Sequence, residues 1–437
     1  MTALSILSIL LGLAVLVYGS MKGYSVFISA IAASVVIGVL GGGGLQQAVL
    51  TDFMTGFVNF IKGNFMVFAA GALMGKAYEI THGAKAVARL FIKLFGSKLA
   101  PFAVLASIWV MTWGGIAGFV LAFSVFPIAL EVFREANLPR QIIPGLIICG
   151  CCTASSWGPG VAQPVNAIMA SGFSVSLTAA FLPSVIMAIS SISAACIVLA
   201  VIIKKARANN EHFEALESDT AQNVTTLPNG LVALIPIIVA LVLINFKING
   251  TALLPIAFGV FAGAVLALLL MNKYRTDTLS LPKHIGQGFQ NALNSIGNTA
   301  AMVAVGSVAQ SAVGFTVIMN AITGMGGNPL IAVALAGFGV SFICGGATGA
   351  VGLLAPILAP TYSAMNVNLE FVGRIVSAAG HIGGTLPNGG FVNTVITGIA
   401  NDSYKRCYTY AFFLVPFVNL VAVVVGIVVM AVMGVYV

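Results

Sequence analysis

The sequences CCTASSWGPG at residues 151–160 and GHIGGTLPNGG at residues 380–390 each interrupt an apolar segment with glycine, proline and small polar residues. Proline removes a backbone donor and glycine weakens helix interiors, so both stretches stop the helical hydrogen-bond ladder. Each is followed by a Val-Asn pair, Val165-Asn166 in the first and Val392-Asn393 in the second. We therefore predict two broken helices, over residues 141–171 and 370–401.

Other features recur in the same order around the two breaks. Upstream, GGIAG at residues 114–118 pairs with GGATG at residues 345–349. Between these features, Pro127 and Asn137 match Pro356 and Asn366 at one common offset. The shared order indicates an internal repeat, with a helical hairpin before each broken helix, over residues 101–133 and 329–363.

The composition requires a lipid environment. Hydrophobic residues make up 59% of the 437 positions, charged residues 7%, and the mean hydropathy is +1.07. A soluble domain carries roughly 25% charged residues because its surface faces water. The N-terminal apolar stretch lacks a basic region and a small-residue cleavage site, so we interpret it as a first span. The net charge of +8 comes from basic residues in short segments between spans, which does not indicate a nucleic-acid partner.

Apolar segments of suitable length define candidate spans. They cover residues 3–17, 24–39, 65–80, 176–203, 231–244, 253–271, 298–322 and 408–435. Between the halves, residues 204–229 are polar and read as a solvated cytoplasmic linker.

Basic residues orient these spans by the positive-inside rule. Lysines and arginines place the linker and the segments at residues 85–98, 273–283 and 405–406 in the cytoplasm, whereas the turns at residues 41–44, 324–329 and 366–368 carry none. Both flanks of the first hairpin lie inside, so this hairpin is re-entrant. The prediction is an all-α polytopic membrane protein of two inverted repeats, residues 1–203 and 230–437. Each repeat has five transmembrane helices, one of them broken, plus one re-entrant helical hairpin, an organisation typical of secondary transporters.

The helix breaks and hairpin tips form the predicted substrate site. Free N–H groups at half-helix N-termini favour an anion, and neutral side chains add hydrogen bonds. The predicted substrate-binding residues are Gly114, Gly115, Thr153, Ser155, Ser156, Asn166, Gly345, Gly346, Thr348, Thr385, Asn388 and Asn393. The alternative is that these small residues only permit close helix packing.

Ionisable residues within spans are candidates for coupling. His381 begins the second break and titrates near neutral pH, so it is the predicted coupling residue; a structural imidazole is the alternative. Arg374 either pairs with a carboxylate or extends outward to the interface, and the second is favoured. Lys76 and Glu79, one turn apart, read as an interfacial ion pair.

No enzyme chemistry is predicted. The six cysteines lie mostly in apolar runs, and neither the Cys149–Cys152 cluster nor the four scattered histidines has metal-ligand spacing. We therefore expect no catalytic residues, no metal site and no cofactor.

The chain resembles the gluconate permease family of the ion transporter superfamily, which includes hydroxybutyrate and related organic-acid permeases. The resemblance rests on ATGAVGLLAP at residues 347–356, GRIV at residues 373–376 and TLPNGG at residues 385–390. It implies a bacterial inner-membrane symporter, usually proton-coupled, with an elevator movement. Gluconate-type members have Asp-Thr-Leu-Pro-His-Asn-Gly, whereas Gly384, Asn388 and Gly389 replace the Asp, His and Asn here.

Together these observations predict a secondary active transporter for a small organic anion such as gluconate, 3-hydroxybutyrate or another short-chain carboxylate. Proton coupling is expected, with lipid and the anion as partners and a homodimer as the assembly. A sodium-coupled carboxylate transporter or a sodium/proton antiporter of the same superfamily is the alternative. A channel and a subunit of a binding-protein-dependent carrier also stay open.

Overall fold

Helices make up almost all of the computed structural model, which describes residues 2–21, 24–96, 99–216, 219, 226–248, 251–275, 279–317, 327–387 and 389–436. Among these residues, six helical segments are long and apolar enough to cross a membrane: Gln47–Ile80, Phe181–Ala208, Ile256–Tyr274, Leu281–Ser311, Ala347–Ala364 and Tyr404–Met433. Further apolar helices are shorter. The predicted class, a multi-pass helical membrane protein, is confirmed.

The first half contains a helical hairpin and a helix in three pieces. Its elements are α1 (Thr2–Met21), α2 (Val26–Leu40), the π-helical turn η1 (Gln47–Phe53), α3 (Met54–Ile80), α4 (Gly83–Phe95), the hairpin α5 (Ala100–Trp113) and α6 (Gly118–Glu135), the pieces α7 (Ile142–Cys152), α8 (Ala154–Trp157) and α9 (Pro164–Gly172), and α10 (Phe181–Ala208).

The second half has a similar order of elements. They are α11 (Gly230–Asn245), the short strands β1 (Lys247–Ile248) and β2 (Thr251–Ala252), α12 (Ile256–Met271), η3 (Asn272–Tyr274), α13 (Leu281–Ser311), the hairpin α15 (Pro329–Cys344) and α16 (Ala347–Ala364), α17 (Leu369–Gly383), α18 (Gly390–Asn393), the π-helical η4 (Thr394–Ile399), α19 (Tyr404–Leu414) and α20 (Pro416–Met433).

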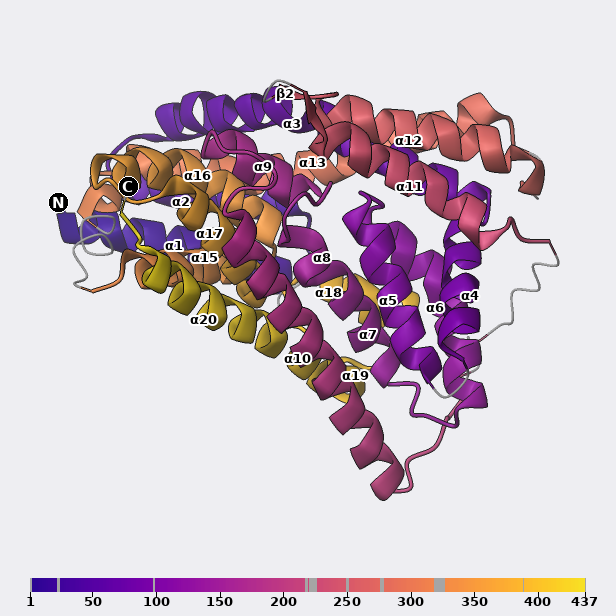
Figure 1. Cartoon of the computed structure of the whole chain (residues 1–437). Coiled ribbons are helices and arrows are strands. Elements are labelled where there is room, and N and C mark those ends of the chain that lie inside the picture. Colours follow the sequence, from indigo (N-terminus) through magenta and orange to yellow (C-terminus); the bar gives the residue numbers. More distant parts are fainter. Residues whose placement is uncertain are drawn as a thin grey trace.

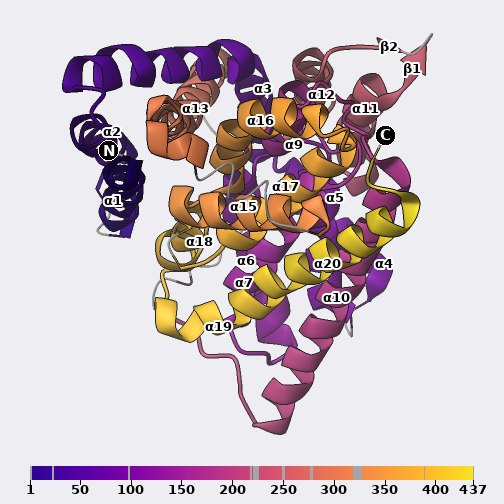
Figure 2. The same ribbon diagram turned by 90° about the vertical axis from the view of Figure 1, so that its left-hand side faces the viewer.

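The two halves pack reciprocally. Helix α3 packs on α12 of the second half, and α13 packs on α2 of the first, while α3 and α13 contact each other. Helix α10 likewise runs beside α20, its counterpart in chain order (Figure 1). Figure 2 shows α1, α2, α3 and α13 gathered at one side of the molecule, beside the group that contains α15–α20. Such exchanged contacts agree with a duplicated chain, and the inverted orientation of the halves stays a prediction.

Several predicted spans have different bounds in the structure. The third begins earlier, because η1 continues into α3. Residues 176–180 precede α10 and are not helical, and the predicted span 298–322 lies within the longer α13 up to Ser311, with residues 318–322 outside the described residues. The last span is divided at Val415, because Pro416 has no N–H to continue the ladder.

Most described residues of the predicted linker are exposed or partly exposed, as expected of a solvated segment, but Asp219 departs from that prediction. Asp219 has a side chain only 2% exposed and is paired with Arg140. Residues 211–214 also contact the protein surface, as set out below.

Candidate functional site

The first break lies between α8 and α9, where residues 158–163 are not helical. Gly160 has a φ of +72°, a left-handed conformation that favours glycine, and Pro164 begins the next helix. Gln163 donates from Nε2 to the carbonyls of Thr112 and Ile116, at 2.7 and 3.0 Å. These carbonyls belong to the tip of the α5–α6 hairpin, so the first hairpin rests directly on the first break.

The second hairpin rests on the second break in the same way. The N–H of Gly390 bonds to the carbonyl of Gly345 at 3.3 Å. A Cβ at Gly384 would lie 2.8 Å from the Ala347 nitrogen and from the Gly346 Cα, so the hairpin tip touches the backbone there. The gluconate-type pattern has aspartate at this position, and a side chain here would collide with the tip.

Arg374 of α17 joins the second broken helix to the first break. Its side chain is fully buried and donates to the carbonyls of Trp157 and Gly158 and to Oδ1 of Asn166. It also bonds the carbonyls of Leu177 and Ala179, at 3.0 and 3.2 Å. The expectation that Arg374 extends outward is therefore wrong. The break leaves carbonyls without helical partners, and the guanidinium has enough N–H donors to satisfy them.

His381 also links the two broken helices. Its Nδ1 lies 2.8 Å from the Ser377 carbonyl, and its Nε2 lies 2.9 Å from the Ser156 hydroxyl. A carbonyl only accepts, so Nδ1 carries a proton, and in the neutral ring Nε2 accepts from the serine. Protonation of the ring would reverse the direction of the second bond.

The predicted site residues in the first break are occupied by protein contacts. Asn166 donates to the Val161 carbonyl at 2.9 Å and accepts from Arg374. Thr153 donates to the Cys149 carbonyl and accepts from the indole of Trp109, and Ser155 donates to the Gly150 carbonyl. All three polar side chains are fully buried, so in this conformation the first break is filled by side chains and backbone of the protein itself.

Three of the four predicted hairpin glycines have a steric or backbone reason to be glycine. A Cβ at Gly114 would collide with Ile237 of α11, and Gly115 and Gly345 have positive φ. A Cβ at Gly346 would meet nothing within 4 Å.

The remaining predicted residues lie near the second break. Thr385 is buried and donates to the His381 carbonyl, whereas Thr348 and Asn393 are half-buried. Asn388 lies outside the described residues.

A cavity of about 790 Å³ lies beside the tip of the first hairpin. Its walls come from α3, α4, α6 and α13, and they carry more basic than acidic groups. The lining residues are Ala72, Lys76, Glu79, Ile80, His82, Lys85, Ala117, Phe119, Val120, Ser124, His284, Asn291, Asn294 and Ser295. The predicted pair forms, with Lys76 Nζ 2.7 Å from Glu79 Oε1. The ring of Phe119 packs edge-on against Phe391, the residue after the second break, with centroids 4.9 Å apart.

Lys85 belongs to α4, which lies outside the candidate spans. Burial and the neighbouring Arg89 cation lower the pKa of its ammonium, against an opposing effect of Glu131. The group therefore loses its positive charge at a lower pH than an exposed lysine.

Sequence reasoning found the breaks but missed the residues that brace them. Gln163, Arg140 and the basic cavity wall were not predicted. Arg140 lies two residues before α7 and Asp402 three residues after η4, so their closeness to the broken helices was visible in the sequence, but not their contact. Within the part of the chain that the structure describes, no three His, Cys, Asp or Glu side chains gather as metal ligands.

No family model matches the chain. The chain is 26% identical over 451 aligned residues to the uncharacterized transporter YxjC of Bacillus subtilis, with 93% of this chain and 95% of that protein covered. Its fold is similar to the crystal structure of the Alcanivorax borkumensis YdaH transporter, which is described as having an unusual topology. The TM-score is 0.61 at 14% identity, over 89% of this chain and 88% of that one.

The likeness to YxjC, together with the apolar helices, supports a multi-pass membrane transporter, and the likeness to YdaH shows the shared fold. Neither relative is named as a gluconate permease, so that resemblance stays a prediction.

Proposed function

We propose that this chain is a secondary active transporter for a small organic anion, working in a bacterial inner membrane. The observation that carries the proposal is the cavity between α3, α4, α6 and α13, which has Lys76 and Lys85 in its wall and ends beside both the first hairpin tip and Phe391. A volume of about 790 Å³ lies within the roughly 300–1,000 Å³ range of small-molecule sites.

The charges and dipoles of the cavity suit a carboxylate. Ala117, the residue before α6, lines it, and an 18-residue helix starting there directs its positive end toward the cavity. Asn291, Asn294 and Ser295 add neutral hydrogen-bonding groups. The lining includes a single carboxylate, Glu79, and Lys76 pairs with it.

The cavity opens on the predicted cytoplasmic side, since Lys76, Lys85 and His82 lie near predicted inner ends of segments. We interpret it as an inward-facing vestibule. In an elevator movement the hairpins and broken helices would shift relative to α1–α3 and α11–α13. Dimerisation would hold α1–α3 and α11–α13 in place.

Proton coupling is proposed to use His381. Its hydrogen bond to Ser156 spans the two broken helices, so a change in ring protonation reverses a contact between them. A sodium-coupled carrier is the second candidate, since the broken helices carry backbone carbonyls and hydroxyls and no carboxylate at the breaks.

An uptake screen tests the proposal. The full chain in proteoliposomes would be offered gluconate, 3-hydroxybutyrate and short-chain carboxylates, with pH and sodium gradients imposed separately. We expect one anion to accumulate against its own concentration gradient when only one of the two ion gradients, pH or sodium, is imposed. Equal uptake with neither gradient would indicate a channel and contradict the proposal.

A further inference from the structure

Part of the linker between the two halves is docked on the surface around α7 and α19. We call residues 211–216 with Asp219 the docked segment. The N–H of Phe213 bonds to Asn137 Oδ1 at 3.2 Å, and the guanidinium of Arg134 lies over the Phe213 ring. At the other edge, Tyr410 donates to Glu211 at 3.2 Å, so the docked segment contacts parts of both halves.

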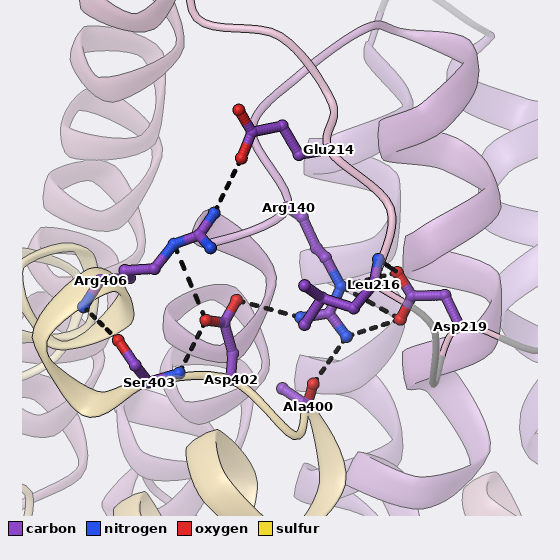
Figure 3. Close-up of polar contacts among 8 residues, drawn as sticks. All are labelled: Arg140, Glu214, Leu216, Asp219, Ala400, Asp402, Ser403 and Arg406. Carbon is purple, nitrogen blue, oxygen red and sulfur yellow. Dashed lines mark hydrogen bonds and ion pairs between the residues drawn. The ribbon is translucent and has the colours of Figure 1, made fainter.

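Arg140 anchors this segment through Asp219 (Figure 3). Arg140 Nε lies 2.8 Å from Oδ2 of Asp219, and Nη2 lies 2.6 Å from Oδ1, a bidentate pair. Nη1 of the same guanidinium lies 3.1 Å from Asp402 Oδ2. The exposed fractions of the three side chains are only 2%, 2% and 3%. Removing one partner from a buried pair leaves an uncompensated charge, so each member depends on the others.

Arg140 thereby contacts the end of the second broken helix. Its Nη2 donates to the carbonyl of Ala400, the residue after η4, at 2.6 Å. A cation at a helix C-terminus interacts favourably with the unpaired carbonyls there. Asp402 is held from its other oxygen by Arg406 at 3.8 Å. Arg140 itself lies just before α7, so one side chain joins the start of the first broken helix to the end of the second.

We propose that Arg140 is a positioning residue through which the docked segment fixes the end of the second broken helix. Asp219 holds the guanidinium fork in the orientation that caps Ala400 and binds Asp402. Undocking of the linker releases that orientation and loosens η4, the helix that follows the second break. The inference rests on the proposed function only for its meaning in transport, since a looser η4 alters the site whose breaks must move.

Hydrogen exchange of the full chain in nanodiscs tests this without any substrate. In Asp219→Asn we expect amides of residues 394–400 to exchange about fivefold faster, because η4 loses its cap while the fold stays intact. The matched control is Glu214→Gln, which removes the same charge from the docked segment. Glu214 pairs with Arg406 at an exposed site, 70% exposed on its side chain, and does not touch Arg140, so we expect less than about a twofold change there.

Three further variants separate positioning by Arg140 from general loosening of the fold. Arg140→Gln and the double variant Arg140→Gln, Asp219→Asn should show the same exchange at residues 394–400, because the second change acts only through the first. Asp219→Glu, which keeps the charge, should restore most of the protection. Faster exchange confined to the docked segment in Asp219→Asn, or additive effects in the double variant, would overturn the inference. If the uptake screen finds no transported anion, the proposed function is contradicted. The exchange experiment still tests this inference, because it needs no substrate.

Discussion

Arg374 on α17 donates to Oδ1 of Asn166 on α9 at 2.8 Å, so a buried cation of the second broken helix sits in the break of the first. Two other contacts on either side support it. Glu370, one turn earlier, accepts from the N–H of Ala180 at 2.6 Å, and His381 meets Ser156 two turns later. The two broken helices therefore form one braced unit.

Substitution of Arg374 should cost more stability than any exposed arginine. Arg374→Met removes the donor shared by the carbonyls of Trp157, Gly158 and Leu177 in the protein interior, at a cost of about 1–3 kcal/mol for each carbonyl left without a partner. Arg374→Lys should recover little, because an ammonium cannot reach the spread of acceptors that a planar guanidinium serves. Thermal unfolding in detergent measures both, with exposed Arg406→Met as the control, where we expect about 0–1 kcal/mol. Equal destabilisation by the two methionine variants would show that Arg374 does not brace the break.

Alanine substitution should lower stability at one glycine near the second hairpin and leave it nearly unchanged at another. In Gly384→Ala the new methyl meets backbone atoms of Gly346 and Ala347 at 2.8 Å, which cannot move aside singly, so we expect a loss of about 1–3 kcal/mol. In Gly346→Ala the methyl meets nothing within 4 Å and the backbone is extended, so stability should change little. The thermal unfolding midpoints of the two variants test this prediction. An unchanged midpoint in Gly384→Ala would mean that the hairpin tip does not pack against Gly384.

The cavity wall should control affinity for the transported anion. Lys85→Gln removes a cation from the wall, and we expect the KM of uptake to rise about tenfold, equivalent to about 1.4 kcal/mol, with a smaller change in maximal rate. Lys93→Gln, on the exposed part of the same helix, is the matched control and should leave the KM unchanged. A similar rise in both variants would point to general surface charge.

The lowered pKa of Lys85 also predicts how anion uptake should change at alkaline pH. Because burial and the Arg89 cation lower the pKa of Lys85 below its usual value of 10.5, its charge is lost at a lower pH than that of an exposed lysine as the pH rises. The KM of uptake should therefore rise with pH in the wild type, and this rise should be absent from Lys85→Gln. Parallel pH profiles for the two proteins would exclude Lys85 as the cause.

Substitution of His381 should impair proton coupling without abolishing anion binding. His381→Gln keeps a hydrogen-bonding side chain but cannot titrate, so we expect accumulation driven by a pH gradient to fall at least about tenfold while exchange of anion across the membrane persists. Ser156→Ala removes the partner hydroxyl and should shift the pH dependence of uptake without abolishing it. Retained pH-driven accumulation in His381→Gln would assign coupling to another group or to sodium.

Docking of the linker should be constant across the physiological pH range. Burial raises the pKa of Asp219, but its hydrogen bonds to Arg140 and to the Leu216 N–H outweigh this, so the pKa lies below the ordinary 3.8. A carboxyl with a depressed folded pKa stabilises above its unfolded value, and that stability is lost as the pH falls through the folded one. Exchange protection of residues 211–216 should thus hold from pH 8 to pH 5 and fall only below about pH 4. Loss of protection near pH 6 would implicate a group other than Asp219.

Much of the architecture could be read from the sequence, for physical reasons that are local. A charged fraction of 7% requires lipid, and glycine with proline at residues 158–160 and 387–390 must interrupt a helix wherever the chain folds. The order of hairpins and broken helices followed from the repeat of such local signals. The dividing point at Val415 was missed, although Pro416 is visible in the sequence.

The contacts of the site were decided by tertiary structure alone. Asn166, Thr153 and Ser155 are polar residues at a break and read as substrate ligands, yet nearby carbonyls and the side chains of Trp109 and Arg374, which the fold brings in from distant helices, take up their bonds. The sequence likewise places Arg374 within an apolar segment and Asp219 within a polar one. Which of these charges is buried depends on distant partners: Asn166 lies 208 residues from Arg374, and Arg140 lies 79 residues from Asp219. Composition and local breaks determined that the chain spans a membrane with two interrupted helices. Only packing, which decides whether a polar atom meets water or another segment, determined which residues brace the breaks and which face the cavity.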